Sequence, residues 1–520
     1  MARRRRSSNR SQAPFASVHK PRGHITPRVQ AAGPEHFGIV SVDCAKVRSK
    51  FLIADYFGNL LQPPTWVEHT RAELQHMVGL VRQTIDQHQL RDVVIAIEQT
   101  GTYHRPVQQV FRRASFDTRL VHPFASSRFR QAADGDLKTD DKDLAGIFRA
   151  AVNGFGLQDP VWPDHYQQLQ LLSRHRRDLV RKNARLRCQI REYLHALMPG
   201  YAGCFSDLFD NPIAITLARQ TGSAEAVRHA GLDGLRQLAR ANGSRVRHST
   251  LATIYAWANT APPAHPQPDL VRQFLATLDD DRLSKSPQIS QLEQQCAHRL
   301  VSTPYVLLLA IPGINVVSAA DVAGELGPID FYAHANHITG RAGLMPARYQ
   351  SDFVDRQGSL CHAGHRRLRV ALLQCADNLI THNHHFQVRS THWRQRGKDP
   401  RWIHVKVAKS FSRIAYAFVA GRTLFPHPCC QPRHYILDKL LEFHRLHDTP
   451  MPWVMLDIEA ATAQLPRRTY DEEAQPLHER LHTINARRRG PQPLRDILPI
   501  VLARLGVAPL QSPAEDRDPG

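Results

Sequence analysis

The sequence predicts an α/β domain followed by a mostly helical region. Before Pro160, short apolar runs of the kind found in buried strands alternate with segments of helical spacing, as in folds with a parallel or mixed sheet. After Pro160 a long heptad pattern begins, and the later apolar segments also have helical spacing. These patterns indicate an N-terminal sheet covered by helices, a long coiled-coil-like arm and a mostly helical C-terminal part.

Two of the predicted strands each end in an acidic residue. Asp43 ends the apolar run in HFGIVSVDCAK, and Glu98 ends the run in VVIAIEQTG, just before the breaker Gly101. Residues 71–88, between these runs, have helical spacing. A carboxylate at the end of a buried strand meets solvent at the end of the sheet, so each strand is expected to present one acid there.

Two further acids are predicted to share one face of a helix. A strand-like run, TRLVHPF, precedes a helical pattern that begins at about Thr139 and includes Asp140 and Asp143. Residues three apart on a helix are neighbours, and adjacent carboxylates raise each other's pKa unless a cation lies between them. Oxygen-only ligands suit Mg²⁺ or Mn²⁺, and two such ions about 4 Å apart can hold both reacting oxygens of a phosphodiester.

A structural interpretation of the same acids stays open. Acidic residues are ordinary at strand ends, and the helix dipole favours them in the first helical turn. Taken singly, each acid is better explained in that way, whereas their order and setting together favour a metal site. Asp141 is the less suitable ligand, and Asp134 and Asp136 are expected to be solvated loop acids.

Several segments together resemble a known family. They are SVDCAK, IEQTGTYH and DGDLKTDDKDLAG, followed much later by LLAIPGINVVSAADVAGELG, AGLMPARYQSD and HAGHRRLRVALL. The chain resembles, from about Phe37 to Gly421, the DEDD insertion-sequence transposases with a RuvC-like domain. That group includes Piv-type DNA invertases and bridge-RNA-guided recombinases. The resemblance implies a RuvC/RNase H-like fold for the first domain.

The resemblance also implies a site and its partners. Asp43, Glu98, Asp140 and Asp143 would be the metal-binding tetrad, and Ser351 in PARYQSD would be the nucleophile that holds DNA covalently. A serine hydroxyl is a poor nucleophile until a base or a metal lowers its pKa. The implied activity is the excision and integration of a mobile element, with DNA as substrate and a noncoding guide RNA from the same element.

The chain departs from the family pattern at two positions. Asp352 follows Ser351 where glycine is usual, and His365 follows Gly364 where asparagine is usual. Asp352 could accept the serine proton or repel the phosphate. Two alternative functions therefore stay open: a metal-dependent nuclease that resembles a junction resolvase and uses water, and a catalytically decayed protein that only binds nucleic acid.

Basic and turn residues in the second half are predicted to contact phosphates. The segment Pro312-Gly313-Ile314-Asn315 resembles a helix-hairpin-helix turn, in which backbone N–H groups at Gly313 and Asn315 can hold a DNA phosphate. Asn315 is expected to tolerate a positive φ there. The other predicted nucleic-acid contacts are Arg366, Arg367, Arg369, Lys406, Lys409 and Arg413. A structural αα-turn and an ordinary solvated face are the respective alternatives.

The heptads predict one helix over residues 164–197, with a second helix from about residue 286 to 300 as its antiparallel partner. Six arginines are expected to form a basic outer surface: Arg174, Arg177, Arg181, Arg185, Arg187 and Arg191. By resemblance, these helices form a homo-oligomer, a dimer or tetramer, and grip RNA. The alternative is an amphipathic helix that packs within its own subunit.

Composition favours a polyanionic partner. The formal net charge is +21 and the pI is about 10.0, which draws nucleic acids or anionic surfaces. No apolar run approaches the roughly 20 residues of a membrane-spanning helix. The 8 cysteines form no CxxC pair and are expected to be reduced thiols in a cytoplasm, without a zinc cage. Histidines, including HNHH at 382–385, are expected to lie on surfaces or in loops.

The predicted domain organisation has five parts. These are a disordered basic arm (1–33) that contacts phosphate or serves solubility, a RuvC-like catalytic domain (34–158), a helical coiled-coil and linker region (159–300), a serine-containing transposase domain (301–421) and a helical extension with a disordered end (422–520).

Overall fold

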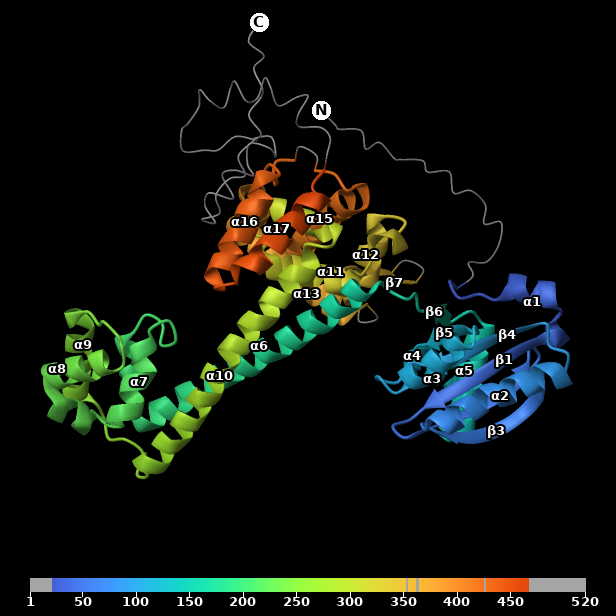
Figure 1. The fold of residues 1–520 in the computed structure, drawn as a ribbon, viewed down its shortest axis with the longest axis horizontal. Helices are drawn as coiled ribbons and strands as arrows, with labels where there is room; N and C mark the ends of the chain where they lie inside the picture. Colours follow the sequence, from blue (N-terminus) through green and yellow to red (C-terminus); the bar gives the residue numbers. More distant parts are fainter. Residues whose placement is uncertain (1–20, 352–353, 362–363, 425–426, 467–520) are drawn as a thin grey trace, which may run out of the picture. The chain divides into compact units, whose positions relative to one another are not determined.

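The structure is a computed structural model that describes residues 21–351, 354–361, 364–424 and 427–466. The chain divides into two compact units after Val161. The first unit combines a mixed sheet with helices, and the described part of the second is almost entirely helical (Figure 1). The α/β plus all-α architecture predicted from the sequence is therefore confirmed at this level.

A six-stranded sheet organises the first unit in the order β3-β2-β1-β4-β5-β6. Its strands are β1 (Phe37–Cys44), β2 (Arg48–Asp55), β3 (Leu60–Glu68), β4 (Asp92–Glu98), β5 (Asp117–Val121) and β6 (Gly156–Gln158). β1, β4 and β5 are parallel, whereas β2, β3 and β6 each run antiparallel to their neighbours. The sheet is mixed, as the alternation of patterns indicated.

Helices cover both faces of this sheet. They are α1 (Thr26–Ala32), the short 3-10 helix η1 (Pro34–His36), α2 (Arg71–Gln87), α3 (His104–Arg113), α4 (Pro123–Asp134) and α5 (Asp140–Val152). Val40 and Ile95 pack with residues of α2 and α3, while Ile39 and Val94 pack on the other face with residues of α1 and α5. Strands buried on both faces read as continuous apolar runs, which is why β1 and β4 were recognisable.

Helix α1 corrects one sequence prediction. Residues 21–33 were expected to belong to a disordered arm, but Ile25, Val29 and Ala32 are buried. Arg28 on the same helix pairs with Asp92 at 2.5 Å and also with Asp117. The prediction of a disordered arm is therefore wrong for residues 21–33, while residues 1–20 lie outside the described ranges.

Two long helices form the arm of the second unit. α6 (Asp164–Leu197) has the bounds that the heptads predicted, and α10 (Pro268–Leu300) begins well before the expected start. Arg176 pairs with Glu293, whereas Ile190 shares a core with Leu275, so the helices run antiparallel and lie side by side (Figure 1). Helix α6 thus packs against α10 of its own subunit.

A small helical cap packs around one end of the arm. It consists of the 3-10 helix η2 (Tyr201–Cys204), α7 (Pro212–Thr221), α8 (Ala224–Ala241) and α9 (His248–Thr260). Leu194 and Leu197 of α6 and Leu275 of α10 lie in the same apolar core as the cap's Leu251 and Ile254. The proline-rich segment 261–267 connects α9 to α10, as expected for a linker.

The remaining described elements share one large core. They are the 3-10 helices η3 (Pro304–Ala310) and η4 (Ile329–Phe331), the helices α11 (Val316–Leu326), α12 (Ala335–Arg341), α13 (Arg366–His382), α14 (His384–Gln395), α15 (Pro400–Gly421), α16 (His434–Leu446) and α17 (Met451–Gln464), and the strands β7 (Pro346–Ser351) and β8 (Val354–Leu360). Leu437, Leu440 and Ile458 of the extension pack with Leu308 and Phe411. The extension therefore docks on the second half of the chain through residue 466, and its later segments lie outside the described ranges.

Candidate active site and nucleic-acid interface

The topology of the first unit brings four carboxylates together. β1 and β4 are parallel neighbours in which Val42 lies opposite Ile97. The next residue on each strand, Asp43 and Glu98, therefore lies at the same end of the sheet, and the two are side by side. Helix α5 begins beside them, because the Thr139 hydroxyl accepts a hydrogen bond from Lys142 N at 3.4 Å and caps it. Leu144 of α5 packs on Leu52 and Ala54 of β2, which fixes the acidic first turn over the sheet.

The raised pKa of Asp43 indicates that the four carboxylates lie close together. Burial and the charges of Glu98, Asp143 and Asp140 together raise the pKa of Asp43 to about 6, while Lys138 opposes them. Burial, Glu98 and Asp140 also raise the pKa of Asp143. Like charges disfavour ionisation of each other only at short range, so the four acids predicted from distant segments form one cluster.

The cluster is open rather than closed around one point. Among the described residues, no three of these acids bring one oxygen each within 4.8 Å of one another. The donor set consists of carboxylate oxygens alone, and their mutual repulsion would be relieved by a divalent cation. The residues therefore fit a cation that prefers oxygen ligands.

Neighbouring side chains hold two of the carboxylates. Glu98 accepts hydrogen bonds from the Ser126 hydroxyl and, at 3.1 Å, from the Thr100 hydroxyl. The Arg130 Nε lies 2.8 Å from Asp143 Oδ1, and another nitrogen of the same guanidinium donates to Leu137 O at 2.8 Å. Sequence reasoning missed these supports. The available signal was the four-residue spacing of Ser126 and Arg130, which places both on one face of α4.

Two other acids near the cluster have separate partners. Asp141 is exposed and pairs with Lys50 at 2.6 Å, in agreement with its expected lesser suitability as a ligand. Asp134 was expected in a loop, but it ends helix α4 and pairs with Arg149 at 3.0 Å. That expectation was wrong for Asp134, because the helix continues to the residue before Gly135.

Ser351 belongs to the second unit. It is the last residue of β7, is exposed, and lies opposite Val354 in the antiparallel hairpin with β8. Asp352, which follows it, lies outside the described residues. His365 occupies the N-cap of α13, where its Nδ1 accepts a hydrogen bond from Leu368 N at 3.2 Å. An asparagine oxygen would accept the same bond, so this departure from the family pattern preserves the cap.

The turn before α11 differs from the expected geometry. Gly313 takes the positive φ, at 94°, whereas Asn315 has a φ of −96° and caps α11 by accepting from Ser318 N at 2.8 Å. The element before the turn is the 3-10 helix η3 rather than an α-helix. A side chain at Gly313 would meet Asn378 O of α13 at 2.9 Å, so the glycine is also needed for close packing.

A cavity of about 460 Å³ adjoins this turn, with Asn315 and Ser318 among its lining residues. Lys439 of the extension also lines it, and its Nζ donates to Ile311 O at 2.9 Å and to Ile314 O at 2.7 Å. Burial lowers the pKa of Lys439 to about 8. The extension thus satisfies the carbonyl groups of the turn.

The predicted phosphate contacts of α13 and α15 divide into two groups. Arg366 and Arg367 are exposed, but Arg369 donates to Ala342 O at 2.8 Å and to Cys361 O at 2.6 Å and is therefore structural. On α15, burial and the neighbouring charges of Lys406 and Arg413 lower the pKa of Lys409. The three α15 residues therefore form one basic stripe, as their spacing predicted.

The arm's arginines also divide. Arg174 pairs with Glu325 at 2.9 Å, and the buried Arg177 pairs with Asp321 at 3.0 Å, so both face α11. The prediction of a basic outer surface is wrong for Arg174 and Arg177, because both pair with acidic residues of α11, a helix that is far from α6 in sequence. Arg187 and Arg191 both lie over the ring of Phe209, while Arg181 and Arg185 remain exposed.

Comparison with known families relates two segments of this chain to transposases. Residues 40–199 match the DEDD model of the IS110 group, described as a transposase, and residues 305–390 match the transposase IS116/IS110/IS902 family. The two matches follow one another in the order expected. Over these two segments the chain is similar to DEDD transposases of the IS110 family.

Named relatives agree with this assignment. The chain is 22% identical over 340 residues to the "Insertion element IS110 uncharacterized 43.6 kDa protein" of Streptomyces coelicolor, covering 64% of this chain and 83% of the relative. It is 24% identical over 341 residues to the "Probable family 20 transposase" of Pseudomonas aeruginosa, covering 65% and 87%. A transposase for the insertion sequence element IS1328 of Yersinia enterocolitica is 23% identical over 164 residues, covering 31% and 46%.

Transposases of this kind cut and rejoin DNA, so DNA is the partner that the family assigns to this chain. Within the described residues, no helix combines the length and the apolar character required to cross a bilayer.

Proposed function

We propose that this protein excises and integrates a mobile DNA element, with Asp43, Glu98, Asp140 and Asp143 as a metal-binding tetrad and Ser351 as the nucleophile. The observation that carries the proposal is the closeness of the four acids: burial first, and then the charges of the other three acids, raise the pKa of Asp43 to about 6. On this view the first unit is a RuvC/RNase H-like domain, and the cation is Mg²⁺ or Mn²⁺.

The chain's own residues would act as follows. A divalent cation bound at the tetrad would neutralise charge on the transferring phosphoryl group. Ser126 and Thr100 hold Glu98, and Arg130 holds Asp143, so the carboxylates are oriented before DNA arrives. The Ser351 hydroxyl would lose its proton as its oxygen forms a bond to phosphorus, a P–O bond of the DNA would break, and the departing sugar oxygen would take up a proton. Attack by another sugar hydroxyl would release the serine and rejoin the strands.

Guidance by a noncoding RNA and assembly into a dimer or tetramer complete the proposal. The +21 formal charge supports a polyanionic partner, and Arg181 and Arg185 on α6 are exposed where such a partner could contact the arm. The arm also exposes large apolar side chains, with Leu171 59% and Leu283 49% exposed, which supports association between copies. The basic stripe of α15, in which Lys406 and Arg413 are exposed, and the exposed residues Arg366 and Arg367 would contact phosphates.

Trapping of a covalent protein–DNA adduct tests the chemistry. Ser351→Ala and Asp43→Asn should each abolish the adduct while DNA binding persists. Ser359→Ala, an exposed serine in the same hairpin, and Asp141→Asn, the exposed neighbour of the tetrad, are matched controls that should retain it. Cleavage that survives Ser351→Ala without an adduct would instead indicate a water-using nuclease, and activity unchanged by Asp43→Asn would exclude the tetrad.

The RNA is tested separately by sequencing nucleic acid that copurifies with the protein. We expect one structured RNA encoded beside the gene, and recombination should depend on adding it back. Binding of DNA or RNA should weaken steeply with salt, because each phosphate contact releases counterions. A purified protein that recombines DNA without any RNA would overturn the guidance part alone.

A further inference from the structure

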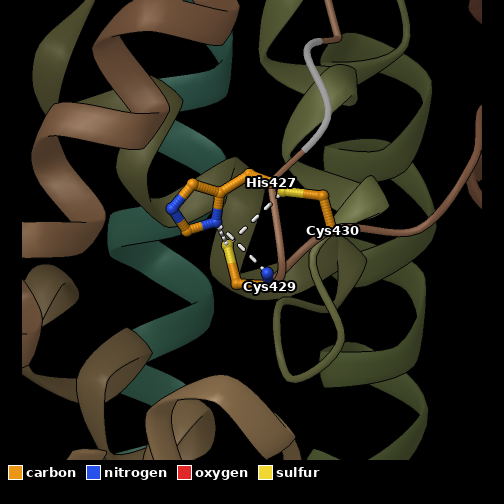
Figure 2. A group of neighbouring side chains, drawn as sticks. All are labelled: His427, Cys429 and Cys430. Carbon is orange, nitrogen blue, oxygen red and sulfur yellow. Dashed lines mark hydrogen bonds between the residues drawn. The ribbon is translucent and has the colours of Figure 1, made fainter.

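Three soft or borderline donor atoms meet in the segment between α15 and α16, far in sequence from the acidic cluster. His427 Nδ1 lies 2.9 Å from Cys429 Sγ, and Cys429 Sγ lies 3.4 Å from Cys430 Sγ. Figure 2 shows the imidazole nitrogen and both sulfur atoms turned toward one another. Among the described residues, this is the one set of at least three potential ligands whose donor atoms all lie within 4.8 Å.

We propose that His427, Cys429 and Cys430 bind a Zn²⁺ ion, with His385 as the fourth ligand. The site goes beyond the proposed recombinase chemistry, because it lies in the second unit and uses none of the acidic tetrad. A set of two sulfur and two imidazole donors is typical of structural zinc sites, which keep no position open for substrate.

The distances fit a small adjustment around an ion. A tetrahedral ion with Zn–S bonds of about 2.3 Å and Zn–N bonds of about 2.0 Å separates two sulfurs by about 3.8 Å and a sulfur from a nitrogen by about 3.6 Å. The observed separations of 3.4 Å and 2.9 Å are shorter because hydrogen bonds link these atoms. Binding would replace the shared protons with the metal and move each donor by less than an ångström.

The two thiols share a proton. Their hydrogen bond lowers the pKa of the buried Cys429 and raises that of Cys430, so a metal would have to displace the proton from Cys430. Burial, together with the charge of Arg389, lowers the pKa values of His427 and His385, so both imidazoles are neutral at physiological pH. Neutral imidazole and thiolate are the forms that bind zinc.

His385 is placed to close the coordination. It is the second residue of α14, and its ring centroid lies 5.1 Å from that of His427 in an edge-on arrangement. Its Nε2 is 3.5 Å from an Arg389 guanidinium nitrogen, which is at the limit of a hydrogen bond. A modest ring rotation would exchange this weak contact for the metal.

The backbone around the site is already fixed to the turn before α11. The buried Asn383 side chain donates to Cys429 O at 2.9 Å and to Pro312 O at 3.1 Å. Gln431 N donates to Ala310 O at 2.8 Å. A zinc ion here would therefore join α14 and the start of the extension to the turn that precedes α11, which gives residues 422–466 a structural role.

Metal analysis of the purified full-length protein tests the site without any DNA. We expect one equivalent of zinc per chain, released by a thiol-modifying reagent and replaceable by Co²⁺. The cobalt protein should show the intense visible bands of a tetrahedral site and a thiolate-to-metal absorption. Cys429→Ser and Cys430→Ser should lose zinc and these bands, whereas Cys188→Ser, an exposed cysteine on α6, should keep both.

Further variants separate the possible outcomes. Asp43→Asn should bind zinc as the unchanged protein does, so failure of the recombinase proposal would leave this result intact. His385→Asn should weaken binding and shift the cobalt bands, and unaltered bands would remove His385 from the site. Wild-type protein that binds neither Zn²⁺ nor Co²⁺ when its thiols are reduced, or that carries a Cys429–Cys430 disulfide in place of metal, would overturn the proposal. Because these measurements use folded wild-type protein, they hold even where a cysteine variant fails to fold.

Discussion

The Arg130 guanidinium lies 2.8 Å from the Asp143 carboxylate and so links helix α4 to the acidic turn of α5. Arg130 lowers the pKa of Asp143, whereas burial and the neighbouring acids Glu98 and Asp140 raise it. The arginine therefore supplies part of the positive charge that a divalent cation would supply. This relationship makes the electrostatic state of the cluster testable without DNA.

Replacing Arg130 should increase the thermal stabilisation given by Mg²⁺. In Arg130→Gln the carboxylates lose their compensating charge, so we expect the metal-free protein to lose about 1–3 kcal/mol and the metal to restore more than it does in wild type. The measurement is the melting temperature with and without Mg²⁺. Arg128→Gln, on the exposed side of the same helix, is the control and should match wild type. An equal metal response in Arg130→Gln and wild type would contradict the prediction.

Asp43→Asn should stabilise the protein in the absence of divalent cations, with a gain that grows from about pH 4 and is complete above about pH 6. The pKa of Asp43 in the folded protein is about 6, above its ordinary value of 3.8, so the fold holds this proton more tightly than the unfolded chain does. Ionising Asp43 therefore lowers stability as pH rises from about 4 to about 6. The amide avoids that loss, so the two melting temperatures should converge near pH 4.

The control for this pH dependence is Asp141→Asn, because Asp141 is exposed and paired with Lys50. It should show no gain that grows with pH. Added Mg²⁺ should narrow the difference between Asp43→Asn and wild type, since the metal favours the ionised carboxylate. A constant difference at all pH values would mean that the fold does not raise the pKa of Asp43.

Much of the fold follows from local patterns in the sequence. Continuous apolar runs identified β1 and β4 because both faces of these strands are buried, and the heptads fixed the bounds of α6. Strand β3 was not predicted, because Pro63 and Pro64 interrupt its pattern. Proline is tolerated there because β3 is an edge strand with no ladder partner on its outer side.

A site residue could be predicted only where the neighbouring sequence alone places it in a strand or a helix. Asp43 and Glu98 could be placed at strand ends and Asp143 in a helical turn. By contrast, the partner of Arg177 is Asp321, and the neighbour of His427 is His385, and no local pattern links residues so far apart. The same reason hid the His427–Cys430 cluster, since a zinc motif of closely spaced ligand pairs is absent from the sequence.

Gly146→Ala should destabilise the first unit and displace the acidic turn. A Cβ at Gly146 would lie 2.6 Å from Ser126 O and 3.1 Å from the Arg130 Cβ, so α5 would have to move away from α4. Such overpacking costs about 1–3 kcal/mol. Gly79→Ala is the matched control, because Gly79 lies in α2 with nothing within 4 Å of an added Cβ, and it should stabilise by about 0.5–1 kcal/mol. Equal effects of the two substitutions on the melting temperature would contradict close packing at Gly146.

Acidification should weaken the packing of the extension against the arm, because it protonates His444. Burial first, and then the charges of His447 and His298, lower the pKa of His444 to about 4. Its ordinary value is 6.5, so the fold requires the neutral imidazole, and the associated stability is complete above about pH 6.5 and is lost as pH falls toward 4. For a side chain only 2% exposed, this shift corresponds to an upper limit of about 3 kcal/mol.

His444 faces Asp457 of α17, whose Oδ2 lies 3.4 Å from His444 Nε2 and whose Oδ1 lies 2.6 Å from His298 Nδ1 of α10. Burial raises the pKa of Asp457, so its protonation at low pH stabilises the fold, whereas protonation of His444 destabilises it. The informative quantity is therefore the difference in exchange rate between wild type and His444→Gln. Hydrogen exchange of α16 and α17 peptides between pH 7 and pH 4.5 should accelerate more in wild type than in His444→Gln, after correction for intrinsic rates. His382→Gln, at the exposed end of α13, should behave as wild type. Equal acceleration in all three proteins would show that His444 does not couple the extension to pH.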